Sequence, residues 1–324
     1  MTHVTPRIGI DLGGTKIEAV VLRVAGDEPE VLARERVETR REEGYDHVVE
    51  ATAQIVADVA RKAGLERLPP VGVGMPGNVT YRTSDGGRSD VPLVKNSNTT
   101  CLNGRPFRGD LARALGARFS GFAPASLAFA NDANCFALAE ARYGAARSAR
   151  VAFGVIMGTG VGGGVVLRHG DDLRVWDGAQ GIAGEWGHVT LDPSADLPCY
   201  CGRCGCVEQF LSGPAIERAY ARRSSVHRSV AEIASRARND ADPDAAATLD
   251  GVVEAFGRAI ATVIHVLDPD AIVLGGGVSN LEALYDRGPA AVARWLFNDE
   301  LRTPIVKHAL GDSAGVIGAA LLDS

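Results

Sequence analysis

Two glycine-rich turns, each lying between apolar segments, are the feature that most restricts how this chain can fold. The apolar segment Arg7–Asp11 leads into Gly13–Lys16, and a second apolar segment, Ile17–Val24, follows at once. In the second half of the chain, Val151–Met157 leads in the same way into Gly158–Gly164, and Val165–Leu167 follows. A strand, a glycine turn and another strand in succession predict a β-hairpin. Two such hairpins far apart predict two lobes built on related plans.

The segments that follow each hairpin alternate between strands and helices. Further strands are expected at Val31–Val37, Val71–Met75, Leu127–Ala130, Ala271–Leu274 and Pro304–His308. Helices are expected at Tyr45–Arg61, Asp132–Tyr143, Ala215–Ala221, Val230–Arg238, Ala245–Leu267, Leu281–Phe297 and Ala314–Leu322. The polar stretch Asn78–Pro92 is expected to be a surface loop. Strands and helices in this order predict α/β lobes with a cleft between them, and 324 residues suffice for two domains.

The composition narrows the class of protein and its compartment. Hydrophobic residues make up 46% and charged residues 23%, which is typical of a soluble globular protein. The net charge of −6 argues against nucleic acid or an anionic membrane as a partner. No secretory signal or apolar run of membrane-spanning length is recognisable. We therefore expect a cytoplasmic protein in a reducing compartment, where structural disulfides are uncommon.

Four of the six cysteines, Cys199, Cys201, Cys204 and Cys206, fall within eight residues, downstream of His188. Such a cluster in a reducing compartment indicates a metal site before it indicates disulfides. One imidazole and three thiolates form a closed tetrahedral zinc site of the structural type. Such a site needs only three of the four cysteines, so one of them would not bind the metal. The alternative to a metal site is that the cysteines are free thiols or form a local disulfide.

Three glycine-rich turns are candidates for binding a nucleotide. Bare backbone amides in a tight turn form an anion-binding nest, and the carboxylate of Asp11 suits Mg²⁺. The third turn, Gly275–Gly277, follows a strand and precedes a helix, where a nucleotide can lie against the backbone. A single glycine turn is often no more than a turn, but three in one chain predict a nucleotide site. The predicted nucleotide-binding residues are Asp11, Gly13, Gly14, Thr15, Lys16, Gly158, Thr159, Gly160, Gly162, Gly275, Gly276 and Gly277.

A catalytic candidate, Asp132, lies with Asn131 where an expected strand meets an expected helix. Sheets of α/β proteins present reactive groups at such junctions. An aspartate before an apolar helix is also commonly an N-cap, and the local sequence by itself favours that role. Glu185 and Glu208 flank the cysteine cluster. Acidic residues are more often solvated than functional, although a zinc site would bring both close to His188.

Together these motifs resemble the ROK family (repressors, open reading frames and kinases), over Ile8 to Leu321. The pattern Cys-x-Cys-Gly-x-x-Gly-Cys-x-Glu after Glu185-Trp186-Gly187-His188 is highly specific. The resemblance implies the actin/hexokinase-like (ribonuclease H-like) α/β fold, with two lobes, a central cleft and a structural zinc site. The implied domains are an N-terminal lobe, 1–122, on which 312–324 packs back, and a larger lobe, 123–311, which carries the zinc loop.

The resemblance also implies roles for individual residues. Asp132 would be the general base that accepts the proton of a sugar hydroxyl as this attacks the γ-phosphate of ATP, with Mg²⁺ neutralising charge. The implied sugar-binding residues are Gly77, Asn98, Asn131, Asp132, Glu185, His188 and Glu208. The implied zinc ligands are His188, Cys199, Cys201 and Cys206, which leaves Cys204 as the extra cysteine. His188 would place one ring nitrogen on zinc and the other on the sugar, and the zinc would hold the glutamates in place.

The run Val94–Phe107 most resembles bacterial fructokinases that also accept mannose, as does the form Cys199-Tyr200-Cys201. Two departures are Cys101, where a tryptophan is expected, and a long loop at Tyr81–Asp90. The predicted function is therefore ATP-dependent phosphorylation of a hexose, at the 6-hydroxyl, by a fructokinase that also accepts mannose.

The alternatives within the family are an N-acetylglucosamine kinase and a glucokinase. A sugar-sensing transcription regulator is the alternative of another class. The first strand begins at Arg7 with no basic tract, so a DNA-binding region is not expected. Dimers are common in the family that the chain resembles, so a homodimer is expected.

Overall fold

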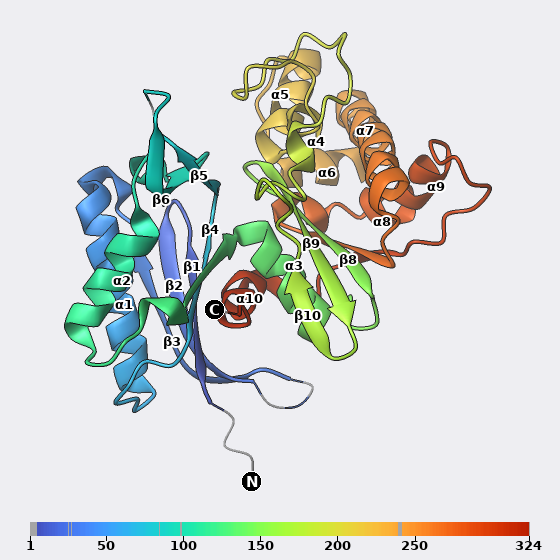
Figure 1. Cartoon of the computed structure of the whole chain (residues 1–324). Helices are drawn as coiled ribbons and strands as arrows, with labels where there is room; N and C mark the ends of the chain where they lie inside the picture. Colours follow the sequence, from blue (N-terminus) through green and yellow to red (C-terminus); the bar gives the residue numbers. More distant parts are fainter. Residues whose placement is uncertain are drawn as a thin grey trace. The chain divides into compact units, whose positions relative to one another are not determined.

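The computed structural model describes residues 5–24, 26, 28–83, 85–97, 99–238 and 242–323. These residues form two compact units (Figure 1). The first unit takes its residues from Met1–Gly144, Asp177–Ile182 and Leu310–Ser324. The second takes its residues from Ala145–Trp176 and Ala183–Ala309. Among the described residues, no helix has both the length and the apolar character that a membrane span requires.

The first unit is built on a five-stranded sheet in the order β3-β2-β1-β4-β7. The strands are β1 (Arg7–Leu12), β2 (Lys16–Arg23), β3 (Glu30–Glu38), β4 (Val71–Met75) and β7 (Leu127–Asn131). β1, β2 and β3 pair antiparallel, whereas β4 and β7 run parallel to β1. The hairpin predicted around Gly13–Lys16 is therefore confirmed.

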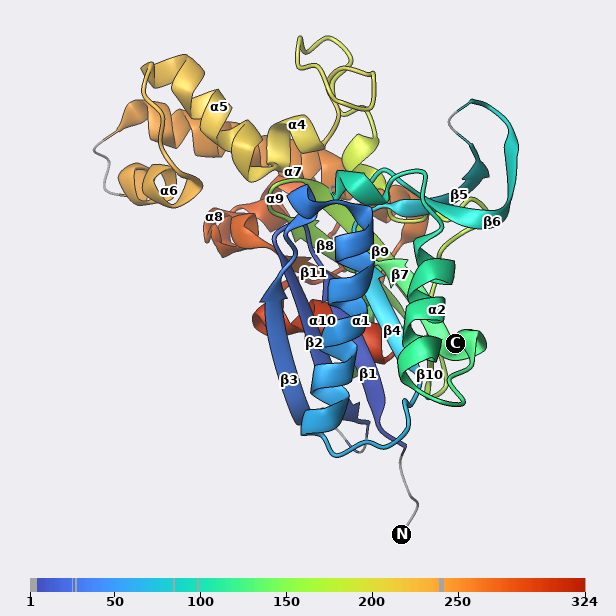
Figure 2. The ribbon, with the colours of Figure 1, turned by 90° about the vertical axis from the view of Figure 1, so that its left-hand side faces the viewer.

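Helices cover both faces of this sheet (Figure 2). They are α1 (Tyr45–Lys62) and α2 (Phe107–Arg118) on one face and α10 (Ala314–Ala320) on the other, with α3 (Asp132–Tyr143) packed against α10. The inward positions of α1, such as Val48, Ile55 and Val59, recur at helical spacing and are fully or almost fully buried.

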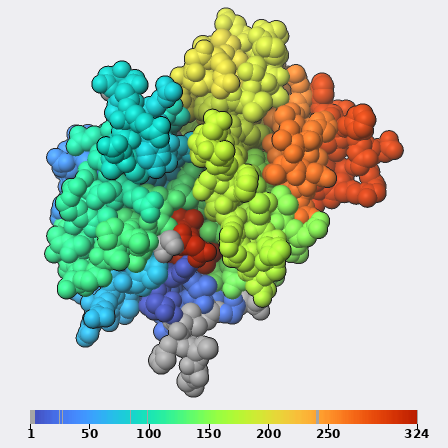
Figure 3. Space-filling model, in the orientation of Figure 1, coloured from blue at the N-terminus to red at the C-terminus, as the bar shows by residue number. Residues whose placement is uncertain are grey.

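The C-terminal helix α10 packs closely on the first strands, and its red atoms lie beside the blue N-terminal atoms in Figure 3. Two glycines permit this approach. A Cβ on Gly9 would lie 2.1 Å from the carbonyl oxygen of Val316, and a Cβ on Gly72 would lie 1.8 Å from that of Ala319. Side chains at these two strand positions are therefore incompatible with the observed packing.

The second unit repeats the same sheet plan in the order β10-β9-β8-β11-β12. The strands are β8 (Val151–Met157), β9 (Val161–His169), β10 (Asp172–Val175), β11 (Ala271–Gly275) and β12 (Ile305–Lys307). β8, β9 and β10 pair antiparallel, and β11 and β12 continue the sheet in parallel, as in the first unit. The prediction of two lobes on related plans is thus confirmed.

The helices of the second unit are grouped around α7 (Pro243–Leu267). The others are α4 (Glu208–Leu211), α5 (Gly213–Ser224), α6 (Val230–Arg238), α8 (Ala283–Asp286) and α9 (Gly288–Ala293). Phe256 and Ile260 of α7 share one apolar core with Ile272 and Leu274 of β11. Short 3₁₀ segments lie at η1 (Arg41–Glu43), η2 (Thr100–Leu102), η3 (Pro124–Ser126), η4 (Trp186–His188), η5 (Gly277–Asn280) and η6 (Gly311–Ser313).

Two expectations about local structure were wrong. The stretch expected to be a loop, Asn78–Pro92, contributes to a two-stranded hairpin of β5 (Asn78–Arg82) and β6 (Arg88–Lys95). The pairing was not predicted because the residues of this hairpin are mostly polar and exposed and lack the apolar pattern of a buried strand. The single helix expected over Leu281–Phe297 is instead two short helices, α8 and α9, because Gly288 and Pro289 start a new helix.

Two boundaries also differ from those expected. Gly162 and Gly163 are not in the turn but pair with β8, so the turn itself is Gly158–Gly160. β7 and α3 belong to the first compact unit, since β7 pairs with β4, whereas the predicted division falls after residue 122. That division into domains stays a prediction.

Candidate functional site

The residues predicted to form the site divide between the two units. The first unit holds Asp11, Gly13, Gly14, Thr15, Lys16, Gly77, Asn131 and Asp132. The second holds Gly158, Thr159, Gly160, Gly162, Glu185, His188, Cys199, Cys201, Cys206, Glu208, Gly275, Gly276 and Gly277. Asn98 lies outside the described residues.

The Asp11–Lys16 turn is held in one conformation by hydrogen bonds. The amide of Gly13 donates to the carbonyl of Lys16 at 2.9 Å, and the hydroxyl of Thr39 donates to the carbonyl of Gly13 at 2.7 Å. A Cβ on Gly14 would lie 3.2 Å from the guanidinium of Arg41. The turn therefore offers backbone amides beside cationic groups, an arrangement that suits phosphate oxygens.

The carboxyl of Asp11, at the end of β1, is electrostatically coupled to that of Asp132, at the start of α3. Burial and then the negative charge of Asp132 raise the pKa of Asp11 from its usual 3.8 to about 6, while Lys16 opposes the shift. Two carboxylates in this relation form a favourable environment for a divalent cation, whose charge would relieve the repulsion.

We expect Asp11→Asn to stabilise the fold at neutral and alkaline pH in buffer without Mg²⁺. Because the folded pKa is raised, the protonated carboxyl favours the folded state below pH 3.8, and this contribution disappears as the pH rises through about 6. The ionised Asp11 then costs on the order of 3 kcal/mol, at about 1.4 kcal/mol per pK unit. Urea unfolding at pH 4 and pH 8 measures the effect. An equal stability difference between variant and unaltered protein at both pH values would contradict it.

Asn131 joins the start of α3 to the turn at Gly77. Its side-chain oxygen accepts a hydrogen bond from the amide of Ala133 at 2.9 Å, and its amide group donates to the carbonyl of Gly77 at 3.2 Å. Asn131 is therefore the N-cap of α3, and Asp132 is the first residue of the helix. Gly77 has φ of 93°, and a Cβ there would lie 2.5 Å from the carbonyl oxygen of Lys95.

Four side chains in the second unit converge as a metal-binding set: His188, Cys199, Cys201 and Cys206, whose ligand atoms all lie within 4.8 Å of one another. The Sγ atoms of Cys201 and Cys206 are 3.6 Å apart, and the Sγ of Cys199 lies 3.5 Å from Nδ1 of His188. Cys204 is exposed and is not one of the four.

These distances fit a tetrahedral zinc site. Bonds of about 2.3 Å to sulfur and about 2.0–2.1 Å to nitrogen place sulfur atoms about 3.8 Å apart and sulfur and nitrogen about 3.6 Å apart. Four protein ligands leave no open position, so this set would hold the metal in a structural role. That the set binds a metal, and that this metal is zinc, stay predictions.

The other ring nitrogen of His188, Nε2, lies 2.8 Å from the hydroxyl of Tyr200. The two rings meet edge to face, with centroids 5.0 Å apart. The family resemblance implied that this nitrogen contacts a sugar, and no sequence motif indicated a contact with Tyr200. A sugar hydroxyl that forms a hydrogen bond with Nε2 of His188 would have to displace the hydroxyl of Tyr200.

The metal-binding loop is connected to the glycine turn of the second unit through Glu208. This residue is only 9% exposed, and its Oε2 accepts a hydrogen bond from the amide of Val161 at 3.0 Å. On the other side, the indole nitrogen of Trp186 donates to the carbonyl of Gly162 at 2.9 Å. Residues on both sides of the metal set therefore hold the start of β9, directly after the Gly158–Gly160 turn.

The wall of a pocket of about 250 Å³ in the second unit includes Asn280, three residues after the third glycine turn. Gly276 has φ of 79° and passes so close to Met157 that a Cβ would lie 2.4 Å from its carbonyl oxygen. The pocket is lined by Ala234, Ala237, Arg238, Ala246, Leu249, Asp250, Asn280, Leu281, Glu282, Ala283, Asp286 and Arg287. These residues were not predicted from the sequence, because no motif marks them.

The ROK family model matches residues 7–324. The chain belongs to the ROK family. Among its curated relatives is the N-acetyl-D-glucosamine kinase of Photobacterium profundum, 34% identical over 97% of this chain and 98% of the relative. The family and two-lobed α/β fold predicted from the motifs are thus confirmed.

Solved ROK structures resemble this one along almost the whole chain. The ROK hexokinase from Thermus thermophilus is 32% identical with a TM-score of 0.81, covering 98% of this chain and 97% of that one. A ROK glucokinase from Streptomyces griseus, solved with glucose and AMPPNP, is 28% identical with a TM-score of 0.72, covering 98% of both chains.

Proposed function

We propose that this protein transfers the γ-phosphoryl group of ATP to the 6-hydroxyl of N-acetyl-D-glucosamine. The chain is an ATP-dependent hexose kinase, as its curated relatives and ROK structures support. The observation that carries the choice of sugar is the full-length similarity to N-acetyl-D-glucosamine kinases, 34% identical in the example from Photobacterium profundum. These relatives do not support fructokinase activity, which was the function predicted from the sequence.

Glucose and N-acetyl-D-glucosamine differ only in the substituent at C2. The similarity to a ROK hexokinase and to a glucokinase solved with glucose supports a hexose of this configuration. We therefore infer that D-glucose is a secondary substrate. Fructose and mannose are expected to be poor substrates, because their carbonyl position or C2 configuration differs.

In the first unit, Asp132 would accept the proton of the attacking hydroxyl. Asn131 supports this role because it caps α3 and leaves the carboxylate of Asp132 at the first helical position. Asp11 would hold Mg²⁺, which neutralises phosphate charge when bound. The amides of the Asp11–Lys16 turn and the ammonium of Lys16 would contact phosphate oxygens.

In the second unit, Glu185, His188 and Glu208 would bind sugar hydroxyls. The metal set supports this role because it fixes the ring of His188 through Nδ1 and connects to Glu208 two residues after Cys206. The metal would supply rigidity rather than chemistry. One oxygen of Glu208 already accepts from Val161, so its second oxygen is assigned to the sugar.

The pocket beside Gly275–Gly277 would take the nucleoside of ATP. Its volume of about 250 Å³ accommodates a base with part of a ribose, and Asn280 and Leu281 on its wall come three and four residues after Gly277. Small alanines on α6 and α7 leave room for a flat ring, and polar side chains at the rim are available to a ribose.

The experiment is a comparison of kcat/KM values for N-acetylglucosamine, glucose, N-acetylmannosamine, mannose and fructose with Mg-ATP, by coupled ADP release. We expect the highest value for N-acetylglucosamine. A clear preference for fructose would overturn the choice of sugar and support the reading of Val94–Phe107 as a fructokinase loop. Absence of turnover with every sugar would favour a sugar sensor.

A further inference from the structure

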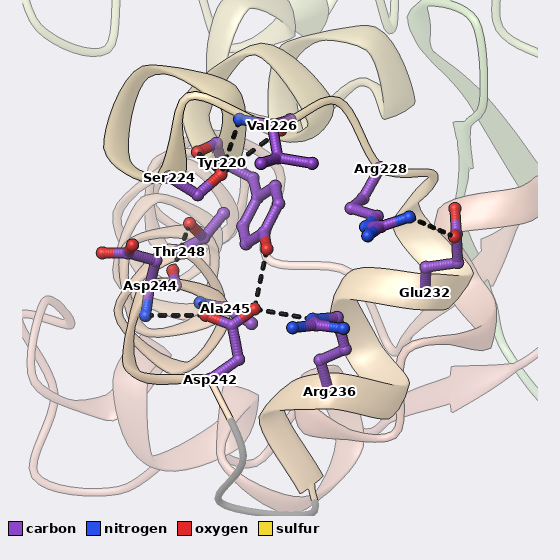
Figure 4. Close-up of polar contacts among 10 residues, drawn as sticks. All are labelled: Tyr220, Ser224, Val226, Arg228, Glu232, Arg236, Asp242, Asp244, Ala245 and Thr248. Atoms are coloured by element: carbon purple, nitrogen blue, oxygen red, sulfur yellow. Dashed lines mark hydrogen bonds and ion pairs between the residues drawn. The ribbon is translucent and has the colours of Figure 1, made fainter.

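Asp242 is the centre of a buried polar cluster that ties three helices of the second unit together (Figure 4). Its Oδ2 accepts hydrogen bonds from the hydroxyl of Tyr220 on α5 and from Nε of Arg236 on α6, both at 2.7 Å. Its Oδ1 accepts from the backbone amides of Asp244 and Ala245 at 3.1 Å, so the same carboxylate caps α7. We call these three side chains, Tyr220, Arg236 and Asp242, the helix clasp.

The carboxylate and the tyrosine of the clasp are buried, whereas the side chain of Arg236 is 44% exposed. Asp242 is 8% exposed and Tyr220 is 3% exposed. The hydrogen bonds from Arg236 and then Tyr220 lower the pKa of Asp242 to about 2, so the carboxylate is ionised at every pH at which the protein would be assayed. Hydrogen bonds to a charged acceptor are stronger than those between neutral groups.

The two helices joined by the Arg236–Asp242 pair also both contribute walls to the 250 Å³ pocket. On α6 the lining positions are Ala234, Ala237 and Arg238, which recur at the spacing of one helix face, while Arg236 reaches the clasp. On α7 the lining begins at Ala246, one turn after Asp242. The distance between the walls therefore depends on the contact that the clasp makes.

Other contacts on α6 do not fix this spacing by themselves. Ile233 is fully buried in the apolar core and anchors the middle of the helix. Arg228 and Glu232 form an exposed pair within the helix and its entry, which makes no link to α7. Arg238 pairs with Glu282 across the pocket rim at 2.8 Å, but both side chains are more than half exposed, and exposed pairs contribute little.

We propose that Asp242 is a positioning residue for the nucleotide, holding α6 against α7 at the spacing that a nucleobase needs. This inference rests on the proposed function, because it assigns the pocket to the nucleoside of ATP. The sugar-binding residues assigned above are not part of the clasp. Loosening the clasp should therefore weaken ATP binding selectively, with a much smaller effect on the sugar.

Asp242→Asn is the most informative variant. Asparagine caps helices as well as aspartate does, so α7 keeps its cap while Arg236 loses its charged partner. We expect the KM for ATP to rise about tenfold, the effect of losing roughly one charged hydrogen bond. The values of kcat and of the sugar KM should change by less than about twofold. Calorimetric titration with the non-hydrolysed analogue AMPPNP should show the same loss of affinity.

Two further variants separate positioning from general stability. Tyr220→Phe removes one hydroxyl only and should raise the ATP KM by a smaller factor, about threefold. Arg294→Met removes an ion pair with Glu254, also at 2.7 Å in the second unit but outside the pocket lining, and should leave the ATP KM unchanged. If Asp242→Asn does not fold, Tyr220→Phe decides the question.

An unchanged ATP KM in the clasp variants would overturn the inference, and so would an equal rise in the ATP and sugar KM values. Failure of the proposed function has a different signature, since the unaltered protein would then release no ADP with any sugar. In that case AMPPNP titration of the unaltered protein and Asp242→Asn still tests the clasp. Equal affinities, or no binding to either protein, would contradict it.

Discussion

Asp132→Asn is expected to lower kcat by about 10²–10⁴-fold, the usual contribution of a general base. The asparagine side chain has the same shape but cannot accept the proton of the sugar hydroxyl at this position. Since Asn131 provides the cap of α3, the substitution should leave the helix intact. Coupled ADP release measures kcat, and calorimetric titration with N-acetylglucosamine should show sugar affinity within about threefold of the unaltered value.

The control for this variant is Asp46→Asn, in the same unit, whose side chain is 97% exposed. It should leave kcat unchanged. A near-native kcat in Asp132→Asn would contradict the assignment of the base. A large loss of sugar affinity with little loss of kcat would make Asp132 a binding residue instead.

Removal of the metal is expected to lower the stability of the second unit and the affinity for sugar together. Cys206→Ser takes a fully buried ligand from a set that ties His188 to the 199–206 loop. We expect the free energy of unfolding to fall by more than about 4 kcal/mol, because loss of a structural metal is among the few single changes with effects of that size. Thermal unfolding measures the stability, calorimetric titration with N-acetylglucosamine measures the sugar affinity, and metal analysis of freshly purified protein measures the zinc content.

Cys204→Ser is the matched control, because Cys204 lies in the same loop but is exposed and outside the metal set. It should retain one zinc per chain and an unchanged Tm. Purified protein without zinc would contradict the metal assignment. A loss of metal in Cys204→Ser as large as in Cys206→Ser would mean that the ligand set is wrong.

Local sequence patterns predicted many elements well because their determinants lie close together in the chain. The helices Asp132–Tyr143 and Val230–Arg238 have the predicted bounds. Both glycine hairpins are present, since a strand that resumes directly after a glycine turn can pair with the preceding one. The metal set was also predictable, because three of its four ligands fall within eight residues.

Features that depend on distant contacts were not predictable. Nothing near Tyr220, Arg236 and Asp242 in the sequence shows that they meet, because they come from three different helices. The partnership of His188 with Tyr200 depends on the fold of the metal loop. The same is true of the pocket, whose walls are ordinary alanine-rich helix faces.

The sugar substrate could not be predicted reliably from one short loop. Cys101, where a tryptophan was expected, packs against the apolar core of the first unit. In the same loop, the side-chain amide of Asn103 accepts a hydrogen bond from the backbone amide of Ser97 and donates one to its carbonyl. Residues in such a loop respond to packing as well as to a ligand. The similarity along the whole chain to N-acetyl-D-glucosamine kinases carries more information than this one loop.

The most direct test of the central claim is ³¹P nuclear magnetic resonance of the purified protein with Mg-ATP and N-acetylglucosamine. We predict that the γ-phosphate signal of ATP is replaced by that of a sugar 6-phosphate, with one ADP formed per sugar phosphate. ADP with inorganic phosphate and no sugar ester would contradict the claim, because it would indicate an ATPase. An unchanged spectrum with every hexose would contradict it as well.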